Sequence, residues 1–230
     1  MVQLSVGEAP LFLFAILKEG VGEPVRLLPE RALFWPAACA LVVADVHWGK
    51  AAAFRAAGIP IPGGATRQDL DRLDQAVART GARRLIVLGD LFHAKAGRIA
   101  TRTLAELRRW REERDTLEIQ LVRGNHDRHA GDPPADLRVN CVDAPAFLPP
   151  FVLRHQPAPA EQGYTLAGHL HPGIVLAGPG LFRERLPCFV VGENVAVLPA
   201  FGSFTGLGMI TPEPGERVFV VAEGEVVPVG

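Results

Sequence analysis

The chain has 230 residues, which suits one compact domain, and 48% of them are apolar, so a large single core is feasible. Its 24 basic and 25 acidic residues give a formal net charge of -1. This balance excludes a global basic field, and charge alone therefore predicts no partner.

The cysteines and the apolar runs limit the cellular compartment. Cys39, Cys141 and Cys188 are odd in number, widely spaced and without a C-x-x-C pair, which argues against a disulfide framework or a thiolate zinc site. The most apolar early run, 11–17, is too short to span a bilayer and lacks the basic flank and cleavage site of a signal peptide. We therefore expect a reduced, cytoplasmic protein without a membrane partner.

The first half of the chain predicts a parallel sheet. Three short apolar runs, rich in β-branched residues, end abruptly in polar residues and predict buried strands over 41–44, 85–88 and 119–122. Helical patterns lie between these runs. Strand, helix, strand, helix, strand implies parallel strands joined by right-handed crossovers.

The two helical patterns have one apolar face each. In the first, Leu70, Leu73 and Val77 share a face, and Thr66 and Asp69 are expected to cap its start. The second helix repeats the same period at Leu104, Leu107 and Trp110 or Arg111. The stretch 58–64, rich in Gly and Pro, is expected to be a loop inside the domain.

After about residue 137 no helix-length period appears. Short apolar segments separated by Gly and Pro predict strands, partly antiparallel, over 150–153, 164–167, 174–176, 188–191, 195–198, 218–221 and 226–229. We expect a single α/β domain over 1–230, a layered sandwich with sheets at the centre and helices outside. The stretch 178–230 carries no motif.

Polar clusters stand at the downstream ends of these runs. They are Asp45-Val-His47, Gly89-Asp90, Gly124-Asn-His-Asp127 and Gly168-His-Leu-His171, with His155 between the last two. Ligand sites in open α/β sheets form beyond the carboxyl ends of strands, so these distant pieces are expected to converge. Residues i and i+2 of an extended chain point to the same side, and each D-x-H or H-x-H pair therefore offers two ligands to one cavity.

The chemistry of this set points to divalent metal ions. Imidazole, carboxylate and amide oxygen together suit Mn²⁺, Fe²⁺ or Zn²⁺. Two such ions outweigh the charge of Asp45 and Asp90, so the site keeps a positive charge and favours an anionic substrate and a bound hydroxide. A phosphate ester meets that description.

The ordered set D-x-H, G-D, G-N-H-D, H and G-H-x-H resembles that of the calcineurin-like metallophosphoesterases, and it covers 45–171. The resemblance implies an α/β fold in four layers, αββα. It implies one metal on Asp45, His47, Asp90 and His171. It implies a second metal on Asp90, Asn125, His155 and His169, so that Asp90 bridges the two. His126 would be the histidine that meets the phosphate or protonates the leaving oxygen.

A narrower resemblance, carried by 47–55, 58–62 and Thr66, is to the bacterial DNA-ligase-associated metallophosphoesterases. The stretches 124–128 and 168–172 are similar to that group too. The group is found beside a DNA ligase and a helicase in DNA repair. This implies a nuclease or phosphodiesterase that acts on DNA with those two partners, and we expect two divalent ions, Mn²⁺ before Fe²⁺ or Zn²⁺. The sequence itself shows no strong basic or aromatic groove.

Four further residues have two interpretations each. His93 lines the site or stabilises phosphate, or it only hydrogen-bonds a loop. Lys50, Arg55 and Arg128 contact substrate phosphate, or they are ordinary surface cations. Asp127 is expected to hold its loop in place rather than to bind metal.

The sequence is also compatible with two alternatives to a DNA nuclease. The chain hydrolyses the phosphate ester of a nucleotide or another small molecule, or it is a metal-bound scaffold that docks a ligase or a helicase with little turnover. The complete ligand set and His126 favour an enzyme over a scaffold.

Overall fold

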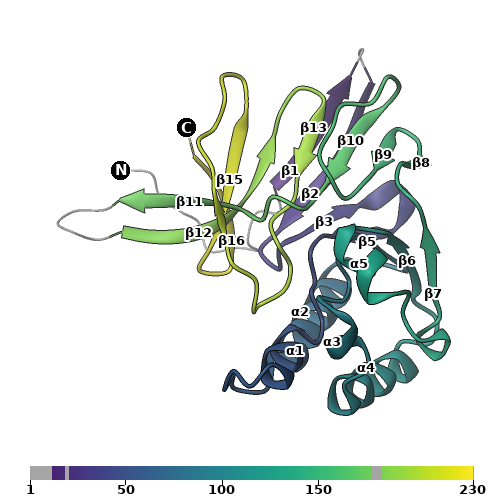
Figure 1. The fold of residues 1–230 in the computed structure, drawn as a ribbon. Coiled ribbons are helices and arrows are strands. Elements are labelled where there is room, and N and C mark those ends of the chain that lie inside the picture. Colours follow the sequence, from purple (N-terminus) through teal and green to yellow (C-terminus); the bar gives the residue numbers. More distant parts are fainter. Residues whose placement is uncertain (1–11, 19–20, 178–182, 230) are drawn as a thin grey trace.

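The computed structural model describes residues 12–18, 21–177 and 183–229, and it arranges them as two β-sheets with helices on one side (Figure 1). Within these residues the helices are α1 Lys50–Ala56, α2 Ala65–Thr80, α3 Lys95–Arg98, α4 Thr101–Glu113 and α5 Asn125–Ala130, with the short 3-10 helices η1 Pro36–Ala38 and η2 Ala135–Leu137. None of the helices in this part of the chain is long and apolar enough to cross a membrane.

The first sheet has seven strands in chain order. They are β1 Phe12–Lys18, β2 Val21–Leu28, β3 Ala32–Trp35, β4 Ala40–Val43, β5 Arg84–Leu88, β6 Glu118–Val122 and β7 Val139–Val142. Strands β4 to β7 run parallel, whereas β1 to β4 are antiparallel. The three early strand predictions are confirmed. The early apolar run 11–17 lies in β1 from residue 12 on, and Leu11 is outside the described residues.

The second sheet contains nine strands within the described residues. They are β8 Ala146–Leu148, β9 Phe151–Leu153, β10 Tyr164–Ala167, β11 Pro172–Ala177, β12 Arg183–Val191, β13 Val195–Val197, β14 Gly208–Met209, β15 Arg217–Ala222 and β16 Glu225–Val229. Strand β10 runs parallel to β9 and β13, and most other pairs are antiparallel. The predicted late strands and their partly antiparallel pairing are confirmed.

Two apolar cores explain this arrangement. One lies between the sheets, where Val42 and Ile86 of the first sheet pack in one cluster with Leu166, Phe189 and Phe219 of the second. The other lies between the first sheet and its helices. Both faces of β4 and β5 are therefore buried, and this is why their sequences are continuous apolar runs rather than alternating ones.

Helix α2 shows how the helical layer is attached. Leu70, Leu73 and Ala76 recur at the helical period and are buried against the first sheet. The helix ends at Gly81, whose φ of 66° gives the left-handed cap that glycine adopts without strain. The predicted helix is confirmed, and 58–64 is the predicted loop that connects α1 to it.

The predicted capping pair of α2 is wrong. The helix begins after Gly64, and no side chain caps it. Asp69 is buried instead, and its Oδ1 accepts a hydrogen bond from the Ser203 backbone N–H at 2.7 Å. The local sequence pattern assigned the Asp69 carboxylate to the helix start, but in the folded chain it binds the distant Ser203 backbone instead.

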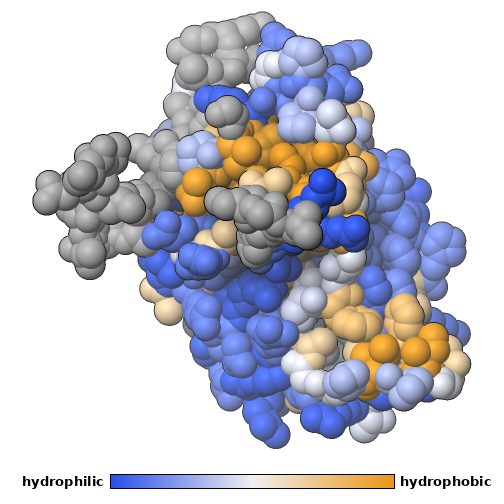
Figure 2. Space-filling view, turned by 90° about the vertical axis from the view of Figure 1, so that its left-hand side faces the viewer, coloured by the Kyte–Doolittle hydropathy of each residue, from blue (hydrophilic) through white to orange (hydrophobic). Residues whose placement is uncertain are grey.

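The α-helices of the described residues all cover the first sheet, and the mixed α/β class with paired sheets is confirmed. The outer face of the second sheet carries an apolar cluster of its own, formed by Cys188, Val190, Val197, Val218 and Val220. Figure 2 shows an apolar area on the side of the molecule where β11, β12, β15 and β16 lie. Along β15, Val218 and Val220 face this cluster, while Phe219 and Val221 face the core between the sheets.

Candidate metal centre

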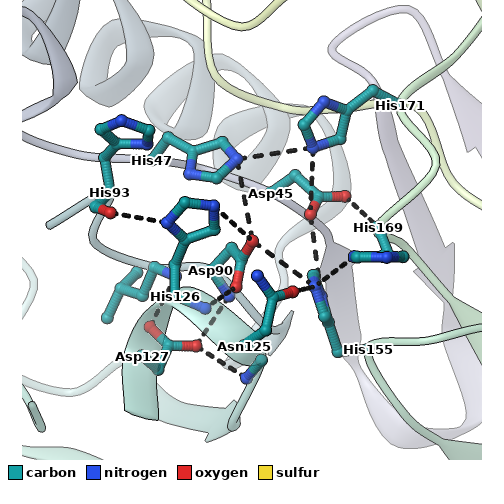
Figure 3. Close-up of polar contacts among 12 residues, drawn as sticks. Asp45, His47, Asp90, His93, Asn125, His126, Asp127, His155, His169 and His171 are labelled. Carbon is teal, nitrogen blue, oxygen red and sulfur yellow. Dashed lines mark hydrogen bonds and ion pairs between the residues drawn. The ribbon is translucent and has the colours of Figure 1, made fainter. Parts of the chain in front are cut away.

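The predicted ligand side chains converge at the carboxyl ends of parallel strands in both sheets (Figure 3). From the first sheet, Asp45 and His47 follow β4, Asp90 follows β5, and Asn125 begins α5 after β6. From the second sheet, His155 follows β9, and His169 and His171 lie between β10 and β11. Each sheet thus supplies part of one cluster.

The backbone of this cluster is strained. A positive φ is uncommon outside glycine, yet it occurs at five of the seven predicted ligands, namely Asp45 (54°), His47 (52°), Asp90 (56°), His169 (73°) and His171 (47°). Such conformations cost on the order of 1–3 kcal/mol each and persist where the surrounding structure enforces them, typically at functional sites. The D-x-H and H-x-H pairs are therefore not extended as expected, although both members of each pair still reach the cluster.

Backbone contacts hold the ligand loops against one another. The N–H of Asp45 donates to the Gly89 carbonyl at 3.2 Å, and the N–H of His47 donates to the Asp90 carbonyl at 2.9 Å. The buried Asp127 carboxylate accepts three backbone N–H groups, from Asp90 at 2.7 Å, Leu91 at 3.0 Å and Gly124 at 2.8 Å. Asp127 thus holds its loop, as predicted.

A segment without any sequence motif also supports the first loop. After β13, the Phe201 N–H donates to the Ala44 carbonyl at 2.8 Å, and the Gly202 N–H donates to the Asp45 carbonyl at 3.2 Å. From helix α2, Asp69 accepts from Ser203 and Arg72 donates to the Phe201 carbonyl. Sequence reasoning missed this support, because it rests on backbone groups that leave no side-chain pattern.

One half of the cluster contains Asp45, His47 and His171. His171 Nε2 lies 3.4 Å from Asp45 Oδ1 and 3.4 Å from His47 Nε2. Burial, reinforced by the charge of Lys50, lowers the pKa of His47 to about 2. The His47 ring is therefore neutral at physiological pH and offers a nitrogen lone pair.

The other half surrounds His155. Its Nε2 lies 2.8 Å from Asn125 Oδ1, 3.0 Å from His169 Nδ1 and 3.4 Å from Asp90 Oδ2. His155 Nδ1 faces the Leu88 carbonyl at 3.0 Å and donates to it, so Nε2 carries the lone pair of the neutral ring. A backbone carbonyl that orients the ring in this way is typical of metal-binding histidines.

These groups fit divalent cations. Asp45 Oδ1 is buried without a hydrogen-bond donor in the described part of the chain, and an unpaired buried carboxylate oxygen is costly unless a cation meets it. Two sets of ligand atoms lie within 4.8 Å of one another, Asp45 with His47 and His171, and Asp45 with Asp90 and His155. Asp45 therefore reaches both halves, whereas the resemblance assigned it to one.

Asp90 lies between the two halves. Its Oδ2 is 3.4 Å from His155 Nε2 and 3.9 Å from His47 Nε2. Its other oxygen accepts the His126 N–H at 2.9 Å, which fixes the carboxylate. Burial raises the pKa of Asp90, and the nearby His155 and the His126 N–H partly offset this effect.

Two glycines make this close packing possible. A Cβ on Gly89, where φ is +78°, would lie 2.3 Å from His155 Nδ1. A Cβ on Gly124 would lie 2.3 Å from Asp90 Oδ1. The glycines next to the predicted ligands therefore leave room for ligands that come from other strands.

His126 and His93 stand together at the edge of the cluster. His126 Nδ1 donates to the His93 carbonyl at 2.7 Å, and its Nε2 faces Asp90 Oδ2 at 3.9 Å. The two rings stack at 4.9 Å, and Phe54 stacks on His93 at 6.1 Å. Burial, followed by the charges of Lys50 and His126, lowers the pKa of His93 to about 4, so His93 is neutral at physiological pH.

The three cations predicted near substrate lie in different places. Lys50 begins α1 beside His47, and burial lowers the pKa of its ammonium group. Arg55 is exposed further along α1 and donates to the carbonyls of Ile61 and Pro62 at 3.2 and 3.3 Å, so it braces the loop before α2. Arg128 lines a cavity next to the cluster.

Comparisons with known proteins agree with this geometry. The sequence model of the calcineurin-like phosphoesterase family matches residues 40–185. Among solved structures, the nuclease MPE of Pseudomonas putida is 45% identical with a TM-score of 0.80, and the match covers 94% of this chain and 100% of that one. The E. coli phosphoesterase Yfce is 16% identical with a TM-score of 0.37, covering 83% and 97%, and is too distant to support an argument. Curated protein sequences gave no significant match.

The family match spans more than half of the chain and includes every predicted ligand, from Asp45 to His171. The clustered carboxylates and imidazoles agree with the metal chemistry that this family uses. The chain belongs to the calcineurin-like phosphoesterase family and is a metal-dependent phosphoesterase.

Proposed function

We propose that the protein is a nuclease that hydrolyses phosphodiester bonds of DNA at a centre holding two divalent metal ions. The observation that carries this proposal is the convergence of seven O- and N-donor side chains into two adjoining groups, with the Asp45 carboxylate within reach of both. The nuclease MPE supports the choice of a phosphodiester in a nucleic acid, because it is similar over nearly the whole chain.

In this proposal each half of the cluster would hold one ion. The first would be held by Asp45, His47, Asp90 and His171. The second would be held by Asp90, Asn125, His155 and His169, and Asp90 could serve both because its Oδ2 faces both His47 and His155. When bound, the ions supply positive charge for the phosphodiester and lower the pKa of an attacking water.

His126 is the proposed proton donor. Its Nδ1–H is held by the His93 carbonyl at 2.7 Å, which fixes the ring and leaves Nε2 facing the cluster. When it is protonated at Nε2, the ring gives this proton to the leaving oxygen. The 3′- or 5′-oxygen of a DNA strand needs this proton because its alkoxide is a poor leaving group. The stacked His93 ring and Phe54 keep the His126 ring in this orientation.

The proposed metal follows from ligand chemistry, and the proposed role and partners follow from the narrower family resemblance. Mn²⁺ is the proposed ion, with Fe²⁺ and Zn²⁺ as alternatives, because imidazole and carboxylate ligands without thiolates suit these ions. The resemblance to ligase-associated phosphoesterases supports a role in DNA repair with a ligase and a helicase as partners. A reduced cytoplasmic location agrees with three cysteines that are free in the structure.

A substrate panel tests the proposed function. Protein loaded with Mn²⁺ is incubated with single-stranded DNA, duplex DNA, RNA, cyclic nucleotides and bis(p-nitrophenyl) phosphate. We expect cleavage of DNA and of the aryl diester. Cleavage of cyclic nucleotides without cleavage of DNA would replace the nuclease with a small-molecule phosphoesterase. Stoichiometric metal binding without any turnover would leave only the scaffold.

Two substitutions separate metal binding from proton transfer. Asp90→Ala is expected to lose both ions, and His126→Ala is expected to keep both while DNA cleavage falls by about 10²–10⁴-fold. Metal content is measured by mass spectrometry. His126→Ala should lose much less activity on bis(p-nitrophenyl) phosphate, whose leaving group needs no proton. Equal losses on both substrates would contradict the role of His126 as an acid, and metal retained in Asp90→Ala would contradict the bridge.

A further inference from the structure

A cavity of about 460 Å³ opens directly beside the second half of the centre. Asn125 and His155 form part of its wall, so it shares two proposed ligands with the centre. The rest of its lining includes Arg123, Arg128, Arg154 and Gln156. The volume is in the range of pockets that hold a ligand as large as a nucleotide.

The lining is positively charged, and two of its three arginines have no ion pair within the described residues. It contains three arginines and no carboxylate among the described residues. Arg123 is neutralised from outside the cavity, by Asp132 at 2.8 Å and Asp143 at 3.3 Å. The Arg154 side chain donates a long hydrogen bond to the Ala158 carbonyl at 3.4 Å, and the Arg128 side chain has no ion pair or hydrogen bond within the described part of the chain. Two guanidinium groups therefore remain available for an anion.

A second large cavity shows that arginine-lined cavities of this protein do not all lack carboxylates. It has about 380 Å³ and lies at the opposite ends of β5 and β6. It contains arginines too, but Asp115 and Glu118 stand among them. Of these two cavities, the one beside the centre combines arginine, no carboxylate in its described lining, and contact with the proposed ligands.

We propose that this cavity binds the nucleotide next to the scissile phosphate, and that Arg128 and Arg154 contact the phosphate that flanks it. The proposal rests on the proposed nuclease function. A strand with one phosphate at the centre extends from it in two directions, and the cavity, whose wall includes Asn125 and His155, is space that one of these directions can occupy. The cavity thus favours a polynucleotide over a small phosphodiester, because only a polynucleotide carries a flanking phosphate.

Paired substitutions test the cavity. Arg128→Gln with Arg154→Gln removes both charges and keeps much of the side-chain volume. Arg83→Gln with Arg109→Gln is the matched control, because both residues are exposed, lie outside the cavity and carry the same charge. For the cavity variant we expect kcat/KM on single-stranded DNA to fall by about 10–100-fold, and on bis(p-nitrophenyl) phosphate to stay within about twofold. The control should match the wild type on both substrates.

Binding supplies a second readout that needs neither metal nor turnover. The affinity of a fluorescein-labelled oligothymidylate is measured by anisotropy in EDTA over a range of NaCl concentrations. The slope of log K against log [NaCl] should become shallower by about 0.7 for each phosphate that the cavity variant no longer neutralises. An unchanged slope, or an equal loss of activity on DNA and on the aryl diester, would overturn the proposal. A wild type that cleaves the aryl diester but not DNA would refute the nuclease function instead, and the binding slope would still decide whether the cavity takes a phosphate.

Discussion

Several residues of the centre have a left-handed backbone conformation, which brings single side chains into the ligand cluster. The backbone has an unfavourable positive φ at Asp45, His47 and Asp90. In this conformation their side chains lie close to ligands from the other sheet. Sequence spacing predicted that these side chains belong together. The spacing did not predict the conformation, because the D-x-H pair is equally compatible with an extended strand and with a strained turn.

Gly89→Ala tests this crowding. The new Cβ would lie 2.3 Å from His155 Nδ1, so His155 must shift and break its contact with the Leu88 carbonyl. We expect metal content to fall by about half or more and kcat to fall by about 100-fold, because small displacements in a catalytic centre are costly. Metal analysis and steady-state kinetics measure the two effects.

Gly81→Ala is the control for that experiment. Its φ of +66° imposes a similar backbone penalty of roughly 1–2 kcal/mol, but its Cβ would meet nothing within 4 Å. It should lower the free energy of unfolding and leave metal content unchanged. Loss of metal in both variants would show that lower stability of the fold, rather than contact with His155, causes the loss.

At the scale of elements, the strands that carry the centre were predictable and the segment that braces them was not. The apolar runs of β4, β5, β6, β9 and β10 are buried, so their sequences reveal them. The brace after β13 works through the backbone of Phe201 and Gly202 and through a carboxylate on α2. Its partners are far apart in sequence, and no local pattern encodes that pairing.

Asp69 makes this brace sensitive to pH. Burial raises the pKa of Asp69 from 3.8 to about 6, so the folded protein binds this proton more tightly than the unfolded chain does. Its contribution to stability is therefore present below the unfolded pKa and is lost as the pH rises through about 6. In metal-free protein, the difference in unfolding free energy between wild type and Asp69→Asn should decrease by about 2 kcal/mol from about pH 4.5 to 7.

Chemical denaturation at several pH values measures that difference. Asp71→Asn is the control, because Asp71 lies on the same helix with its side chain half exposed. Its difference from the wild type should change much less with pH. A difference for Asp69→Asn that stays constant over the range would show that burial does not perturb this carboxyl.

At the scale of the whole molecule, the centre joins the two sheets. Asp45 and Asp90 come from the first sheet, and His155 and His171 come from the second. The apolar core between the sheets holds them in register, with residues such as Ile86 and Phe189 on its two sides. Ions bound at this seam should therefore stabilise the complete sandwich rather than a local loop.

Metal titration tests that coupling. At a Mn²⁺ concentration about 100 times the dissociation constant, binding adds about 2.7 kcal/mol, which should raise Tm by about 5–10 °C for a chain of this length. Calorimetry or fluorescence measures the shift. Asp90→Ala should abolish it. A wild-type Tm that does not respond to Mn²⁺ would contradict a centre that binds only the folded chain.

The division of the centre between two sheets also sets when the protein becomes active. A growing chain holds Asp45 and His47 long before His169 and His171 are synthesised, and the second sheet must then dock on the first. Hydrolysis therefore starts only after the sandwich closes, and an incomplete or misfolded chain is inactive. Completion of the centre therefore depends on the synthesis of His171, its last ligand along the chain, and on the docking of the two sheets.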